Sequence, residues 1–207
     1  MPYLGNEVAP LVQALEGKEL KLDSDGDSSI QASTDDTVVF KTNGSNRWTL
    51  NSSGNLFPAS TSQGIVLGAT SDTSANRLDD YEEGEFVATL DNSVTLHGSS
   101  DSLQYTKIGR QVMICGQIRI SSTNTNAVVI NNLPFTSIDG TDGSEFTFGT
   151  VRLYEYNIPS DSKYVGCYTA SNDTRLHFTN VRDNAVTDPL DADQDGYLMF
   201  TATYFAA

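Results

Sequence analysis

Two stretches divide the chain into parts of different character: Arg77-Leu78-Asp79-Asp80-Tyr81-Glu82-Glu83-Gly84-Glu85-Phe86 and Tyr105-Thr106-Lys107-Ile108-Gly109-Arg110-Gln111-Val112. The chain before them consists of short strand-and-turn units with few large apolar residues. The chain after them has longer alternating segments and most of the aromatic residues. We therefore expect the acidic residues of the first stretch to form a solvated turn, a hinge between a repetitive part and a β-sheet part.

The overall charge excludes some classes of partner. The 207 residues include 12 Lys and Arg against 27 Asp and Glu, a formal net charge of −15. Phosphate backbones and anionic lipids attract basic patches, so we expect neither nucleic-acid binding nor membrane insertion. No apolar run approaches the ~20 residues of a membrane span. No secretory signal is evident, so we expect synthesis in a cytoplasm.

A short amphipathic helix is expected at residues 7–16, with Asn6 as its N-cap and Gly17 at its end. Apolar residues recur there at i, i+3, i+4 and i+7, which places them on one helix face. A helix of about ten residues is marginal alone in water. This face is therefore expected to pack on another copy of the chain or on a socket protein. Its members are Val8, Leu11, Val12 and Leu15.

Residues 18–76 repeat one or two apolar residues about every eight to ten positions, between turn clusters rich in Asp, Asn, Ser and Gly. A repeat that cannot bury its own apolar face must stack on neighbours, and three copies wound around a shared axis would supply them. A flexible linker is the alternative, although the regular β-branched and aromatic residues favour strands. The expected core of this β shaft is Leu20, Ile30, Val38, Phe40, Trp48, Leu50, Leu56 and Ile65.

Residues 77–207 show the period-2 alternation of antiparallel β-strands. In residues 111–120, for example, Val112, Ile114 and Ile118 share one face, opposite Met113 and Cys115. About nine strands at short spacing predict a β-sandwich or jelly-roll head. The strands are expected at residues 86–90, 94–97, 104–108, 111–120, 127–130, 145–156, 163–168, 175–181 and 197–205.

The two cysteines, Cys115 and Cys167, both fall inside expected strands. Two cysteines are too few for a disulfide framework, and we interpret them as small buried side chains. A disulfide between them requires Cα atoms within about 7 Å, which the sequence leaves open.

The run Asp191-Ala192-Asp193-Gln194-Asp195-Gly196 matches the beginning of a calcium-binding loop. The bidentate Glu of an EF-hand would fall on Ala202, inside an expected strand, which excludes an EF-hand. A looser calcium site on Asp191, Asp193 and Asp195 and an Asx-rich turn are the two remaining interpretations. No other cofactor is expected. Asp23, Asp25 and Asp27 form a weaker version of the same pattern.

The sequence contains no recognisable catalytic grouping, and we expect the protein not to be an enzyme. His97 and His177 lie far apart, and no nucleophile or phosphate-loop motif occurs. Paired carboxylates can hydrolyse glycosides, and the stretch from Asp79 to Glu85 contains five of them. Nothing in the sequence places two of these carboxylates across a sugar-sized cleft. The aromatic residues Phe146, Phe148, Tyr154 and Tyr156 share one strand face, which forms either a core stripe or a platform that stacks on sugars.

The two stretches that divide the chain resemble the C-terminal domain of fibre and virion appendage proteins of tailed bacteriophages. The segment Phe86-Val87-Ala88-Thr89-Leu90 lacks the proline that is common in that domain. The opening Pro2-Tyr3-Leu4-Gly5-Asn6 is similar to that of several phage tail and fibre proteins, and residues 48–56 resemble a recurring phrase of fibre shafts.

This resemblance implies a homotrimer in a virion, made in the cytoplasm of the bacterial host. Residues 1–17, including Tyr3 and Leu4, would dock on a phage tail, adaptor or capsid protein. The head, residues 77–207, would bind a polysaccharide or protein of the host surface. The alternatives are a capsid decoration fibre without a receptor role and a glycan-cleaving spike, which the small head disfavours. Head fibre and tail fibre are not distinguished.

Three polar loops of the head, at residues 121–126, 139–144 and 171–174, are expected to contact the receptor because they lack apolar periodicity. Their candidate contact residues are Ser121, Asn124, Asn126, Asp139, Asp142, Asn172 and Asp173.

Overall fold

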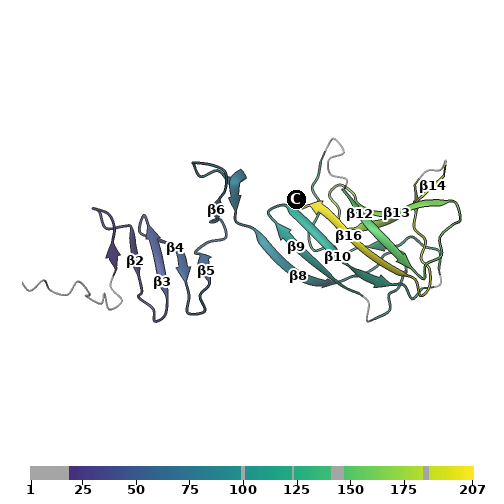
Figure 1. Ribbon diagram of the computed structural model, residues 1–207, viewed down its shortest axis with the longest axis horizontal. Coiled ribbons are helices and arrows are strands. Elements are labelled where there is room, and N and C mark those ends of the chain that lie inside the picture. The colour runs from purple at the N-terminus through teal and green to yellow at the C-terminus, as the bar shows by residue number, and fades with distance from the viewer. Residues whose placement is uncertain (1–18, 99–100, 123, 141–146, 184–186) are drawn as a thin grey trace, which may run out of the picture. The chain divides into compact units, whose positions relative to one another are not determined.

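The computed structural model describes residues 19–98, 101–122, 124–140, 147–183 and 187–207 (Figure 1). The expected helix at residues 7–16 and the attachment residues Tyr3 and Leu4 lie outside this part of the chain. The described residues form an all-β protein whose paired strands are antiparallel, with one short 3-10 turn at Ser74–Asn76. In these ranges no helix has the length and apolar character that a membrane crossing requires.

The chain forms two compact units, one up to Asp79 and one from Asp80 to Ala207. The strands of the first unit are β1 (Leu20–Lys21), β2 (Ser29–Gln31), β3 (Val38–Thr42), β4 (Ser45–Leu50), β5 (Leu56–Pro58), β6 (Ile65–Val66) and β7 (Arg77–Leu78). Strands β1 to β5 form one sheet in which each strand pairs with the next, and β6 pairs with β7. The turn Asn43-Gly44 has φ angles of 51° and 67°, as in the Asn-Gly hairpins that join twisted strands.

The second unit is built on a single nine-stranded sheet. Its strands are β8 (Tyr81–Val87), β9 (Ser102–Ile108), β10 (Gln111–Arg119), β11 (Val129–Ile130), β12 (Thr147–Tyr154), β13 (Ser162–Thr169), β14 (Leu176–Arg182), β15 (Asp188–Pro189) and β16 (Tyr197–Phe205). Their order is β11-β14-β13-β12-β16-β10-β9-β8, with β15 paired to β14. The C-terminal strand β16 therefore lies in the middle of the sheet, between β10 and β12 (Figure 1).

This sheet curls into a half-barrel, and the segment that follows one edge strand, β8, lies beside the other edge strand, β11. After β8 the chain returns beside β11, where Leu90 bridges Ile130 and the Asp91 amide donates to the Val129 carbonyl oxygen at 2.9 Å. The expected antiparallel all-β head is found, and its strands lie in one curled sheet. One curled sheet encloses the core, because the same side of every strand turns toward the interior.

The core lies on the concave side of the curled sheet. The alternation predicted for residues 111–120 is found, since Val112, Ile114 and Ile118 are buried while Met113 is exposed. Strand β16 alternates in the same way along its whole length. The largest fully buried side chains of the unit are Tyr204, Phe178, Leu103, Ile114, Ile118, Ile120, Ile130, Leu176 and Leu198.

The acidic stretch is a strand, not the solvated turn that we expected from the sequence. Its residues from Tyr81 onward lie in β8, which pairs with β9 along its whole length, and Asp79 and Asp80 lie between β7 and β8. The Asp80 carboxylate accepts a hydrogen bond from Lys107 Nζ, and the Tyr105 hydroxyl donates one to the Glu82 carboxylate. The mostly buried Lys107 ammonium also lies 5.3 Å from the centre of the Phe135 ring. The two stretches that divide the chain thus hold each other in place.

The two cysteines are not paired. Cys167, on β13, faces the core, and burial raises the pKa of its thiol to about 12. Cys115 lies on the outer side of β10 and is partly exposed. The interpretation of both residues as buried side chains is therefore correct for Cys167 and wrong for Cys115.

We expect iodoacetamide to alkylate Cys115 in the native protein and to leave Cys167 unmodified. The thiolate is the reacting species, and a buried thiol with a pKa of about 12 supplies almost none of it at about pH 8. Mass spectrometry of tryptic peptides measures the labelling of each residue. In urea both cysteines should react, and equal labelling of both without denaturant would contradict the burial of Cys167.

Candidate functional site

The five-stranded sheet of the first unit gathers apolar side chains on one face. Residues directly opposite each other in antiparallel strands point to the same side, and the observed register therefore identifies the members of each face. We call the apolar one the shaft face. It consists of the row Leu20, Ile30, Phe40, Trp48 and Pro58 across all five strands, and of the second row Val38, Leu50 and Leu56.

The shaft face contains seven of the eight residues that the sequence suggested as a shaft core. The eighth, Ile65, lies on β6 in the two-stranded sheet. Several members are exposed in the single chain, including Leu56 at 57% and Phe40 at 39%. Solvent-exposed apolar side chains that lie side by side in this way mark an interaction surface.

The opposite face of the same sheet is mostly polar. Lys41 Nζ lies 3.1 Å from both Glu19 Oε1 and Gln31 Oε1, and the buried Ser29 hydroxyl donates to Glu19 Oε1 at 2.5 Å. These hydrogen bonds, from Ser29 first and Lys41 second, lower the pKa of the Glu19 carboxyl. The sheet thus has one face with its own polar network and one face that the described residues leave partly open.

In the second unit, the structure separates the expected receptor loops to opposite ends of β16. Ser121 follows β10 near the beginning of β16, where the Ile120 amide donates to the Gly196 carbonyl oxygen at 3.0 Å. Asp139 and Asn172 lie near the other end of β16. There the Asn172 amide donates a hydrogen bond to the Ile138 carbonyl oxygen, and the Ile138 amide donates one to the Phe205 carbonyl oxygen.

The chain enters the second unit at the Phe205 end of β16. Phe205 pairs with Gln111, and Ile108, at the other side of the β9–β10 turn, pairs with Tyr81. The loop that contains Asp139 and the loop that contains Asn172 and Asp173 therefore lie at the entry end, and Asp142 lies outside the described residues. Ser121, Asn124 and Asn126 lie at the far end.

The far-end loops brace one another through side-chain amides. Asn124 Nδ2 donates to the Ser93 carbonyl oxygen at 3.0 Å, and Asn126 Nδ2 donates to that of Asn92 at 2.7 Å. Beside them lies a shallow polar cavity of about 570 Å³, lined by Asn92, Ser93, Asn126 and Asp191 among others. The expected contact residues here also stabilise the loops that carry them.

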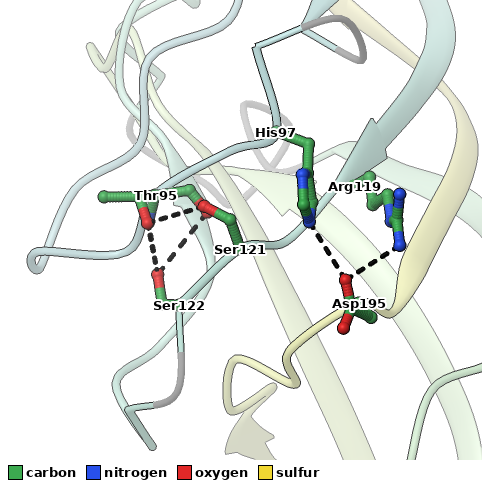
Figure 2. Close-up of polar contacts among 6 residues, drawn as sticks. All are labelled: Thr95, His97, Arg119, Ser121, Ser122 and Asp195. Atoms are coloured by element: carbon green, nitrogen blue, oxygen red, sulfur yellow. Dashed lines mark hydrogen bonds and ion pairs between the residues drawn. The ribbon is translucent and has the colours of Figure 1, made fainter.

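A neighbouring group of polar side chains fixes the segment before β9 to the ends of β10 and β16 (Figure 2). Asp195 Oδ1 lies 3.0 Å from His97 Nε2 and accepts a hydrogen bond from Arg119 Nη2 at 2.8 Å. The Thr95 hydroxyl lies 2.8 Å from that of Ser121 and 3.0 Å from that of Ser122. Together these contacts tie three separate segments of the chain at the far end.

The combination of hydroxyl, histidine and aspartate in Figure 2 is not arranged as a catalytic triad. A nucleophilic hydroxyl must lie within hydrogen-bond reach of the histidine that activates it. Within the described ranges the hydroxyls of Ser121 and Ser122 bond to Thr95, and His97 bonds to Asp195. The arrangement positions loops and provides no activated nucleophile.

The structure does not gather Asp191, Asp193 and Asp195 around one point. Asp195 is held by His97 and Arg119, and Asp193 accepts hydrogen bonds from the backbone and side-chain amides of Asn157. Among the described residues, the carboxylates that do converge are those of Asp23, Asp25 and Asp27, within 4.8 Å of one another.

The convergence of Asp23, Asp25 and Asp27 has a local cause. Asp23 Oδ1 accepts the amides of Gly26 at 3.0 Å and Ser28 at 3.2 Å, as in an Asx turn. Hydrogen bonding from Ser28 lowers the pKa of Asp23 to about 2. The Asx-turn interpretation therefore accounts for this loop, and calcium binding stays a prediction.

The aromatic stripe on β12 lies on the outer, convex side of the curled sheet. Phe148 is 76% exposed and Tyr154 is 48% exposed, so these two residues do not form the core stripe that was one interpretation. Tyr156 packs against the core instead, with its hydroxyl donating to the Asp191 carbonyl oxygen at 2.6 Å. Phe146 lies outside the described residues.

Phe148 forms one wall of a groove of about 350 Å³ that runs across β12, β13 and β14 toward β15. We call it the aromatic groove, and its principal lining residues are Phe148, Tyr164, Gly166, Tyr168, Thr179 and Pro189. The β13 members are not among the binding residues that the sequence predicted. Their signal was the alternation Tyr164-Val165-Gly166-Cys167-Tyr168, which places two tyrosines and the glycine between them on one side of a strand.

The chain was compared with protein families, curated proteins and solved structures. No family model, curated protein or solved structure matches the chain.

Proposed function

We propose that this chain is a structural subunit of a bacteriophage virion appendage. In this proposal three copies share the shaft face, and the C-terminal unit binds the host surface, where its partner is a polysaccharide or a protein. The observation that supports assembly is the one-sided apolar row across β1 to β5. The resemblance of the two stretches around β8 and β9 to phage appendage proteins supports the virion location.

The physical argument for assembly is that the first unit has almost no core of its own. Among its large apolar side chains, within the described residues, only Val39 is buried. Burial of a large apolar side chain stabilises by about 1.5–3 kcal/mol relative to full exposure. The eight residues of the shaft face are partly exposed, so covering them stabilises each chain by several kcal/mol. Copies of the same face around a common axis supply that cover.

The contacts in the C-terminal unit agree better with binding than with catalysis. Its polar clusters at the far end hold loops in place, and its exposed aromatic side chains lie on the convex face. We therefore favour a binding head over a glycan-cleaving one.

Attachment to the particle is assigned to residues 1–17, and a pair of substitutions tests it. We expect Leu11→Asp with Leu15→Asp to leave the purified protein folded and to stop its incorporation into virions, because two charges replace the apolar face of the expected helix. Ala9→Asp with Gln13→Asp has the same spacing off that face and serves as the control. Quantitative immunoblotting of purified virions gives the measurement. Equal incorporation of both double variants would refute the attachment role.

A further inference from the structure

We propose that the aromatic groove is a binding site for a neutral oligosaccharide. This inference rests on the proposed host-surface function and assigns it a site and a ligand class. The groove lies on the outer side of β12 to β15, away from the hydrophobic core, and none of the six residues drawn in Figure 2 lines it.

The shape of the groove follows from the register of three strands. Phe148 pairs with Tyr168, which pairs with His177, and these large side chains form one wall. The next row is small: Thr150 pairs with Gly166, which pairs with Thr179. Tyr164 and Val181, also directly paired, form the next row of large side chains. A row of small residues between two rows of large ones makes a groove that crosses the strands from β12 to β15, where Pro189 pairs with Thr179. It is roughly 14 Å long for the three spacings between these four strands.

Tyr164 is held flat across the floor of the groove. Its hydroxyl donates to the Gly149 carbonyl oxygen at 3.3 Å. A Cβ built on Gly166 would lie 2.6 Å from the Tyr164 hydroxyl oxygen and 2.7 Å from a ring carbon, so the ring rests on the glycine. The ring is nevertheless half exposed. One aromatic face is therefore packed on the sheet while the other is presented to solvent in a fixed orientation.

The second tyrosine of the groove is held by stacking. The Tyr168 ring lies 5.0 Å from the His177 ring, with 20° between their planes. His177 Nε2 in turn lies 3.5 Å from Asp173 Oδ2, and Asp173 also accepts hydrogen bonds from Arg175 Nε. The sequence suggested Asp173 as a receptor contact. In this proposal Asp173 instead contacts His177, which supports the wall of the groove.

The chemistry of the groove matches a pyranose ring. One face of a pyranose presents C–H groups, whose slightly positive hydrogens are attracted to the negative face of an aromatic ring, while its edges carry hydroxyls. The groove offers aromatic faces from Tyr164 and Phe148, with threonine hydroxyls from Thr179 and Thr187 beside them. Rings held in place in advance lose little side-chain entropy on binding.

The negative charge of the protein favours neutral glycans over anionic ones. None of the groove's lining residues is charged, and the chain has a formal net charge of −15. A polyanionic glycan would be repelled without gaining an ion pair in the groove. A protein partner of standard size covers about 800 Å² on each side, far more than this groove offers. A neutral oligosaccharide is the ligand that fits both size and charge.

The experiment uses the full-length protein on a printed array of neutral bacterial surface polysaccharides and their uronic-acid or phosphate-bearing counterparts. We expect retention on neutral members, weaker retention on acidic ones, and a loss of about tenfold or more in affinity for Tyr164→Ala. Gly166→Ala keeps both tyrosines but displaces the Tyr164 ring, and it should lose binding to a similar extent. Tyr154→Ala is the matched control, since Tyr154 is a similarly exposed tyrosine of the same outer face, outside the groove.

The outcomes separate this inference from the proposed function. Absence of retention on all neutral members, or equal retention by the wild type, Tyr164→Ala and Gly166→Ala, would overturn the glycan site. Altered oligomeric mass in Tyr164→Ala would likewise overturn it, because the groove would then be a contact between copies of the chain. Glycan binding by a monomeric protein would support the glycan site and contradict the proposed fibre. An oligomer that binds no glycan would support the fibre and contradict the glycan site.

Discussion

The Phe40→Asp variant is expected to be monomeric, and the wild-type protein is expected to be an oligomer. Phe40 lies in the middle of the five-residue row of the shaft face, paired with Ile30 on one side and Trp48 on the other. An aspartate there would place an unpaired carboxylate in an apolar interface, where an isolated charge costs several kcal/mol. Size-exclusion chromatography with light scattering at micromolar concentration measures the change in mass.

Phe57→Asp is the matched control for this prediction. Phe57 is 45% exposed and lies on β5 of the same sheet, but it pairs with Thr49 and therefore points to the opposite face. The same substitution there should leave the oligomer intact. If Phe40→Asp and Phe57→Asp behaved alike, the shaft face would not be the contact surface.

The second large effect is expected for Asp80→Asn, which should lower the free energy of unfolding of the C-terminal unit by about 2–3 kcal/mol. The substitution leaves the Lys107 ammonium, on a residue that is only 8% exposed, without its carboxylate partner. The Phe135 ring, 5.3 Å away, stabilises the cation only in part. The estimate lies below the usual cost of breaking a buried pair because the Asp80 side chain is half exposed.

A substitution of the partner residue, Lys107, distinguishes the loss of this ion pair from a general destabilisation by any change in β8 or β9. Lys107→Met removes the buried charge and leaves Asp80 free to be hydrated, so it should cost about 1 kcal/mol or less. The double variant should then be close to Lys107→Met alone. Urea denaturation curves of the three variants give the values, and additive losses in the double variant would contradict the pairing.

The sequence predicted the faces of the strands better than their arrangement. In the first unit, regular turn clusters set the strand spacing, so seven of the eight residues from Leu20 to Ile65 that were expected to form one surface do lie on one face of a single sheet. Ile65 differs because β6 pairs with β7, more than ten residues further along the chain. Local patterns do not report such a distant partner.

Strand β8 and the residue before it show why the prediction of a solvated turn was wrong. Asp80, Glu82 and Glu85 suggested a solvated turn because their partners are not nearby in sequence. Those partners, among them Lys107 and Tyr105, are supplied by β9 after an intervening segment of about fifteen residues. The curl of the sheet was hidden for the same reason, since it depends on the contact between Leu90 and Ile130.

The aromatic groove was found in part. The exposed stripe with Phe148 was recognised as a candidate sugar platform, but its partners on β13 were not. A groove needs the register of adjacent strands, which brings Tyr168 beside Phe148 and Gly166 beside Thr150. Period-2 alternation gives the side of a strand on which a residue lies, and it does not give the neighbour across the sheet.

The most direct test of the account is the mass of the wild-type protein in solution. In the proposed assembly, three copies of the chain cover one another's shaft faces. Light scattering at micromolar concentration should therefore give three times 22.4 kDa, about 67 kDa. A folded protein with a mass of 22.4 kDa under those conditions would contradict it.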